Sequence, residues 1–70
     1  MATGTVKWFD RTRGYGSITP DGGGQDIFVS HTAIAGPIAE GFKMVAPGAR
    51  VEFEVRDGER GPEAIRVLAG

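Results

Sequence analysis

Strict alternation of apolar and charged residues is the feature that most constrains how this chain can fold. In residues 51–56, the apolar residues Val51, Phe53 and Val55 alternate with charged neighbours. Successive side chains of a β-strand point to opposite faces, so this pattern predicts a strand with one buried and one exposed face. No window of the sequence has the i, i+3, i+4, i+7 apolar spacing of an amphipathic helix. We therefore predict an all-β protein.

Turn-forming residues divide the chain into five predicted strands. The strands cover residues 3–9, 15–19, 26–30, 51–56 and 64–68, and residues 32–34 form at most one helical turn after the third strand. Clusters of glycine, proline and acidic residues mark the connections at 20–24 and 57–62. Five short strands without a crossover helix favour a small antiparallel barrel over an open sheet, because closure removes exposed strand edges.

The predicted core follows from the parity of the apolar positions in these strands. It consists of Ile18, Ile27, Val29, Val51, Phe53, Val55, Ile65 and Val67, with Val6 and Ile34 as additions. These side chains are enough to fill a small closed barrel. They leave several large aromatic residues outside it.

Length and composition narrow the class of protein. Seventy residues allow one domain, residues 1–70, with no room for a large catalytic cleft. Without cysteine the chain has no disulfide and no thiolate metal site, which fits the reducing cytoplasm. No targeting or membrane-spanning segment is visible. The formal net charge is -1, but residues 1–19 carry a local charge of +2 and residues 20–42 carry -3.

The aromatic residues outside the predicted core point to a ligand. Tyr15 and Phe28 fall on the solvent side of adjacent predicted strands, near Trp8 and the cations Lys7 and Arg13. Exposed aromatic faces flanked by cations are the surfaces on which unpaired bases stack. Single-stranded nucleic acid is therefore the predicted ligand.

Several motifs in a fixed order support this interpretation. Residues 13–18, RGYGSI, agree with the ribonucleoprotein motif at five of six positions. The segments VKWFD at 6–10, DIFVSHTAI at 26–34, GFK at 41–43 and GPEA at 61–64 accompany it. In that order they resemble the bacterial cold-shock protein family over essentially the whole chain. The resemblance implies a five-stranded OB-fold barrel that binds single-stranded RNA and DNA with little sequence preference, as an RNA chaperone or a regulator of transcription or translation.

The resemblance also implies which residues bind. The family's binding positions correspond to Lys7, Trp8, Arg13, Tyr15, Asp26, Phe28, Phe42 and Arg60. We add Phe9, Lys43 and Asp10, the last of which stands where the family usually has asparagine. Ser17, Ser30 and His31 occupy motif positions but depart from the family pattern, since Ser17 and His31 replace aromatic residues. Residues 35–41 also make a loop a few residues longer than is usual in the family.

One prediction concerns the backbone of the first strand. Strict alternation puts Lys7 and Trp8 on opposite faces, whereas the family places both at the ligand. A β-bulge or a strongly twisted edge near these residues would reconcile the two.

The same residues permit other interpretations. A β-barrel that binds a proline-rich peptide would also expose aromatic residues. The RNA-recognition-motif fold needs two amphipathic helices that this chain lacks. An enzyme is not expected, because His31 is the only histidine and has no catalytic or metal-binding partners. We predict no cofactor, no metal, no small-molecule substrate, no membrane partner and a monomeric state.

Overall fold

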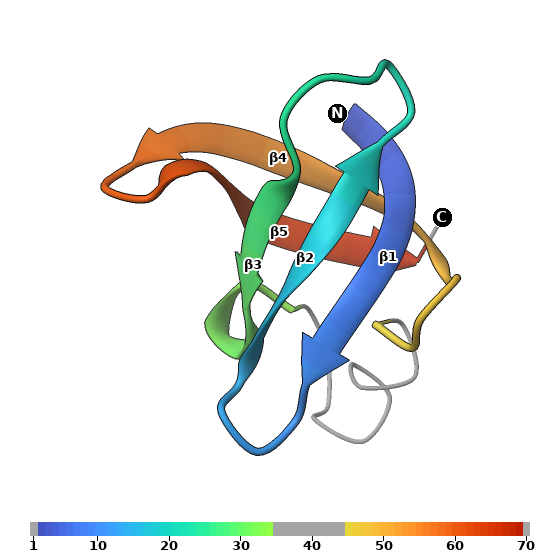
Figure 1. Ribbon diagram of the computed structural model, residues 1–70, viewed down its shortest axis with the longest axis vertical. Coiled ribbons are helices and arrows are strands. Elements are labelled where there is room, and N and C mark those ends of the chain that lie inside the picture. Colours follow the sequence, from blue (N-terminus) through green and yellow to red (C-terminus); the bar gives the residue numbers. More distant parts are fainter. Residues whose placement is uncertain (1, 35–44, 70) are drawn as a thin grey trace.

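The computed structural model describes residues 2–34 and 45–69, with the side chain of residue 69 left aside, and these form a closed five-stranded barrel (Figure 1). The strands are β1 (Ala2–Asp10), β2 (Tyr15–Pro20), β3 (Ile27–Ser30), β4 (Arg50–Gly58) and β5 (Gly61–Ala69), and one 3₁₀ turn, η1 (His31–Ala33), follows β3. The predicted all-β barrel and the predicted helical turn are confirmed. Four strands extend the predicted ranges by up to three residues at their ends, and β3 begins one residue later than predicted.

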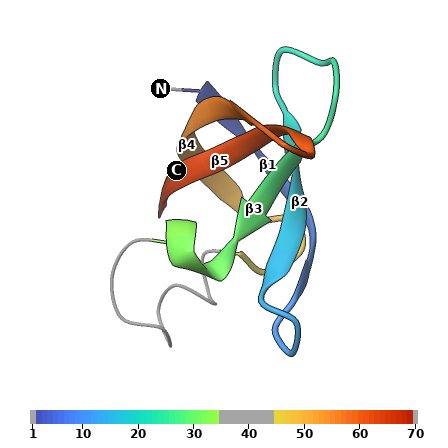
Figure 2. The same cartoon turned by 90° about the vertical axis from the view of Figure 1, so that its left-hand side faces the viewer.

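The order of strands around the barrel is β1-β2-β3-β5-β4, and β4 closes the barrel by pairing with β1. The pairings are antiparallel except between β3 and β5, which run parallel with Phe28 opposite Glu63 and Val29 opposite Ala64. Figure 2 shows η1 at the end of β3, beside β5. The parallel pairing brings the last strand next to the aromatic residues of β2 and β3.

Among the described residues, every buried side chain of the interior is apolar. The buried set is Val6, Ile18, Ile27, Val29, Val45, Val51, Phe53, Ala64 and Val67, with Phe9, Ala33, Ile34 and Ala49 packed against it. Of the ten predicted core residues, seven are buried and an eighth packs against them. The seven are Val6, Ile18, Ile27, Val29, Val51, Phe53 and Val67, and the eighth is Ile34. Val45 and Ala64 were not predicted, and the predictions for Val55 and Ile65 are wrong.

Val55 and Ile65 are each 42% exposed, for two related reasons. Glu54 pairs with Arg66 and Val55 pairs with Ala64, so Ile65 is an extra residue in β5 and the inward position passes to Ala64. β4 pairs with β1 only as far as Phe53, so the segment containing Val55 belongs to a β4–β5 hairpin that projects beyond the barrel (Figure 1). The alternation in the sequence continues past the point where the core ends.

The predicted irregularity in the first strand is confirmed. Val6 pairs with Ile18 and Trp8 pairs with Ser17, so Lys7 is the extra residue of a bulge in β1. Val6 is buried, whereas Lys7 and Trp8 are both exposed. The bulge thereby places two consecutive side chains on the outside of the barrel.

Candidate nucleic-acid interface

One row of side chains crosses the outer surface of all five strands. Trp8 pairs with Ser17, Ser17 with Phe28, Phe28 with Glu63, and Glu63 with Arg56. Directly opposed residues of neighbouring strands project to the same face. We call these five residues the outer row, and none of them belongs to the core.

Tyr15 joins the two aromatic residues of the outer row. The Trp8 and Tyr15 ring centroids are 5.9 Å apart in an edge-on arrangement, and the Tyr15 and Phe28 centroids are 5.8 Å apart with 31° between their planes. Trp8 is 43% exposed, and Tyr15 and Phe28 are half-buried. The three rings therefore form a continuous aromatic surface, and Ser17 lies between Trp8 and Phe28 in the row.

A glycine in β2 allows the chain to pack closely beside this surface. A Cβ at Gly16 would collide with the Trp8 carbonyl oxygen and would lie 2.7 Å from Phe9 Cδ2. Glycine leaves that space to the Phe9 ring, which packs against the core and is half-buried. Phe9 thus packs beside Gly16 and against the core.

The cations beside the aromatic surface are held by one or two contacts each. Lys7 Nζ lies 3.0 Å from Asp26 Oδ2. Arg13 Nη1 donates to the Tyr15 hydroxyl at 3.2 Å, and Arg13 Nε lies 3.7 Å from Asp10 Oδ2. The Tyr15 hydrogen bond, followed by the charges of Tyr15 and Asp10, raises the pKa of Arg13 further above its high ordinary value, so the side chain stays cationic.

Asp10 also shapes the turn between β1 and β2. Its Oδ1 accepts hydrogen bonds from the backbone N–H groups of Thr12 at 2.9 Å and Arg13 at 3.0 Å. This is the local bonding for which aspartate and asparagine are favoured in turns. Asp10 therefore positions Arg13 beside Tyr15.

Ser30 and His31 lie where β3 passes into η1. Ser30 Oγ accepts from the Thr32 N–H at 3.4 Å and from Thr32 Oγ1 at 3.1 Å, which caps the 3₁₀ turn. The exposed His31 ring lies against Gly14, with Nδ1 3.2 Å from the Gly14 carbonyl oxygen. Gly14 has a φ of 82°, and a Cβ there would lie 2.7 Å from His31 Nδ1. The imidazole therefore extends the site toward the β1–β2 turn.

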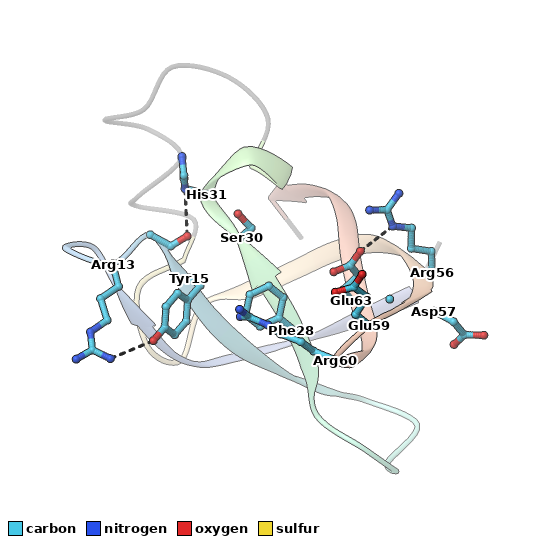
Figure 3. Close-up of a pocket in the computed structure, with 12 residues that line it drawn as sticks. Arg13, Tyr15, Phe28, Ser30, His31, Arg56, Asp57, Glu59, Arg60 and Glu63 are labelled. Atoms are coloured by element: carbon cyan, nitrogen blue, oxygen red, sulfur yellow. Dashed lines mark hydrogen bonds and ion pairs between the residues drawn. The ribbon is translucent and has the colours of Figure 1, made fainter.

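An open groove of about 890 Å³ connects these residues with the β4–β5 hairpin (Figure 3). Arg60 extends from that hairpin, with its guanidinium 5.0 Å from the centroid of the Phe28 ring. A smaller extension of about 230 Å³ runs on between Phe28, Thr32 and Ile65. The described part of the site is therefore a surface path with no enclosed cavity.

The hairpin side of the groove contains charged residues that sequence reasoning did not select. These are Arg56, Asp57, Glu59 and Glu63, of which Glu63 also lines the smaller extension. Their place in the groove depends on the parallel β3–β5 pairing, which the strand patterns do not reveal. Only the resemblance at Arg60 pointed to this hairpin.

The other predicted site residues divide into two groups. Lys7 and Asp26 pair with each other and do not line the groove. Phe42, Lys43 and the predicted long loop at 35–41 lie outside the described residues.

Comparison with known proteins agrees with this geometry. Residues 2–69 match the family described as the 'Cold-shock' DNA-binding domain. The chain is 51% identical over 67 residues to the cold shock-like protein CspA of Vibrio cholerae, covering 96% of this chain and 91% of that protein. It is 50% identical over 66 residues to the cold shock-like protein CspC of Escherichia coli K12, covering 94% and 91%. It is 51% identical over 67 residues to the cold shock-like protein CspA of Stigmatella aurantiaca, covering 96% and 94%.

Among residues 2–34 and 45–69, no helix is long and apolar enough to cross a membrane. The family match spans nearly the whole sequence. The chain belongs to the cold-shock domain family, whose members bind nucleic acid and are not enzymes.

Proposed function

We propose that this protein binds single-stranded RNA and DNA by stacking unpaired bases on Trp8, Tyr15 and Phe28. The observation that carries the proposal is the continuous contact of these three rings on the outside of the barrel. Every base has a flat face, so stacking gives affinity with little dependence on sequence, about 1–3 kcal/mol per base. A base within a duplex is already stacked and paired, which favours single strands.

Phosphate contacts would come from the cations that border the rings. Lys7 adjoins Trp8 in β1, Arg13 lies beside Tyr15 and Arg60 lies beside Phe28. Each already has a partner within the protein, so a phosphate must replace or share an existing contact. We expect these contacts to orient the strand and stacking to supply most of the free energy.

Arg60 has a second consequence for binding. Its guanidinium lies over the ring of Phe28, where a base would stack. A base must displace Arg60 or be enclosed between Arg60 and the ring. In the first case the Arg60 guanidinium becomes available to a phosphate, and in the second it stacks on the base.

The cellular role that fits such binding is that of an RNA chaperone or a regulator of transcription or translation. Binding that depends on unpaired bases favours the unfolded form of an RNA over its hairpins by mass action. We propose that the protein acts as a monomer in the cytoplasm, because the described aromatic residues lie on one open surface and the sequence has no cysteine.

The fluorescence of Trp8 tests this proposal directly, because Trp8 is the single tryptophan of the sequence. Oligothymidine should quench it with saturation, because a stacked base contacts the exposed indole. A proline-rich peptide of equal length is the control ligand. Quenching by the peptide and not by oligothymidine would replace this proposal with a protein-interaction function.

A further inference from the structure

Glu63 lies next to Phe28 in the outer row and faces the groove. The parallel pairing of β3 with β5 sets the two residues opposite each other, so their side chains share one face of the sheet. The side chain of Glu63 is only 21% exposed, although it lines both the groove and its smaller extension. Figure 3 shows the Phe28 ring between Tyr15 and Glu63. Glu63 is therefore the polar group beside this end of the aromatic surface.

The Glu63 carboxylate is held in place but keeps one oxygen open. Arg56 Nε donates a hydrogen bond to Oε1 at 2.7 Å. Gly58 lies behind the carboxylate, since a Cβ at that position would be 2.7 Å from Glu63 Cδ. Among the residues that the structure describes, none donates a hydrogen bond to Oε2. A fixed carboxylate with a free oxygen is an acceptor that cannot donate.

The edges of the bases differ in what they offer such an acceptor. Cytosine, adenine and guanine carry exocyclic amines, which donate. Thymine and uracil carry carbonyl groups in those places, and their one ring N–H lies between two carbonyl oxygens that repel a carboxylate. We propose that Glu63 selects, at the position stacked on Phe28, a base with an exocyclic amine over thymine or uracil. The inference rests on the proposed function and adds one base preference to an otherwise tolerant surface.

Repulsion between Glu63 and phosphate is the competing explanation for any effect of this carboxylate. Repulsion acts on all strands equally, because every nucleotide carries the same phosphate. Asp57 provides the matched control, since it lines the same groove but pairs with Pro62 and not with a residue adjacent to Phe28. Glu63→Gln and Asp57→Asn each remove one negative charge without changing the size of the side chain.

The experiment compares a thymidine hexamer with a hexamer of 5-methyl-2′-deoxycytidine by quenching of Trp8 fluorescence at pH 7. The two bases have the same ring and methyl group and differ at the amine and the adjacent ring nitrogen. Thermal melting verifies that each variant is folded. The measured quantity is the ratio of the two dissociation constants, thymidine over 5-methyldeoxycytidine.

We expect this ratio to fall about threefold to tenfold from the wild type to Glu63→Gln, because glutamine can donate to a carbonyl as well as accept from an amine. Asp57→Asn should tighten both hexamers alike and leave the ratio unchanged. A ratio unaffected by Glu63→Gln, or reduced as much by Asp57→Asn, would overturn the inference alone. If neither hexamer binds the wild type, the proposed function fails and the inference fails with it.

Discussion

Ion pairs at two places on this barrel differ in how many of their hydrogen-bonding groups have partners within the protein. At the Asp21 corner, which consists of Asp21, Arg50, Thr3 and Thr5, the Arg50 guanidinium donates to both carboxylate oxygens at 2.6 Å. Thr3 Oγ1 donates to the same carboxylate at 2.7 Å, and Arg50 also reaches Thr5 Oγ1. The pairs around the aromatic surface are single contacts, such as Lys7 with Asp26 at 3.0 Å.

The number of hydrogen bonds distinguishes a pair that only stabilises the fold from pairs whose groups can also bind a ligand. The bidentate pair joins the start of the β2–β3 connection to β1 and β4 and uses most of its donors and acceptors internally. The pairs at the aromatic surface leave donors and acceptors available to phosphates and base edges. Residue type alone does not distinguish the two kinds of ion pair, since both consist of a cation and a carboxylate.

The largest expected effect is that of Phe28→Ala on binding. Removal of this outward-facing ring should weaken oligothymidine binding at least about tenfold and leave the melting temperature nearly unchanged. Phe53→Ala is the control, because Phe53 is fully buried and its loss should cost about 3–5 kcal/mol of stability. Trp8 quenching and thermal melting measure the two quantities. If Phe28→Ala mainly unfolds the protein, our assignment of its face is mistaken.

Ser17→Phe should have the next largest effect. Ser17 pairs with both Trp8 and Phe28, so a ring there would add a stacking surface between them. We expect affinity for oligothymidine to rise about fivefold or more, with little change in stability. Ser17→Ala separates the alternatives. If the alanine variant binds worse and the phenylalanine variant no better, the Ser17 hydroxyl is itself a contact.

Salt should weaken binding with a shallow slope. Lys7, Arg13, Arg56 and Arg60 are the described cations near the aromatic surface, and each phosphate contact contributes roughly 0.7 to the slope of log K against log salt. We therefore expect a slope of about -3 or shallower. Arg13→Ala should reduce its magnitude by about 0.7, whereas Arg50→Ala at the Asp21 corner should leave it unchanged. A slope of magnitude 7 or more would contradict the proposed contacts.

The sequence predicts the strands and the aromatic surface because both depend on local alternation. Tyr15 and Phe28 are outward for the same reason that Ile18 and Val29 are buried. The bulge at Lys7 was predictable only by adding the family's placement of two consecutive residues to that alternation. Local pattern and family resemblance together account for most of the candidate site.

The remaining features depend on contacts between distant segments. Ile65 keeps the alternation of its strand in sequence, but a bulge in the pairing with β4 turns it outward. Glu63 reaches the site only because β5 lies parallel to β3, a pairing between residues far apart in the chain. Val45 is buried although it lies outside every predicted strand. No pattern within a single strand contains this information.

The smallest expected effect is a change in acid stability at the Asp21 corner. The hydrogen bonds from Arg50 and then from Thr3 lower the pKa of Asp21 from 3.8 to about 2. A carboxylate whose pKa is lowered by folding stabilises the protein above its ordinary pKa, and that contribution is lost as the pH falls from about 4 toward 2. Asp21→Asn should therefore be less stable than the wild type at pH 7, by a small amount because the pair is exposed, and the difference should shrink toward pH 2. Urea unfolding of both proteins between pH 2 and 7 measures this, and a difference that stays constant with pH would show that the charge of Asp21 does not stabilise the corner.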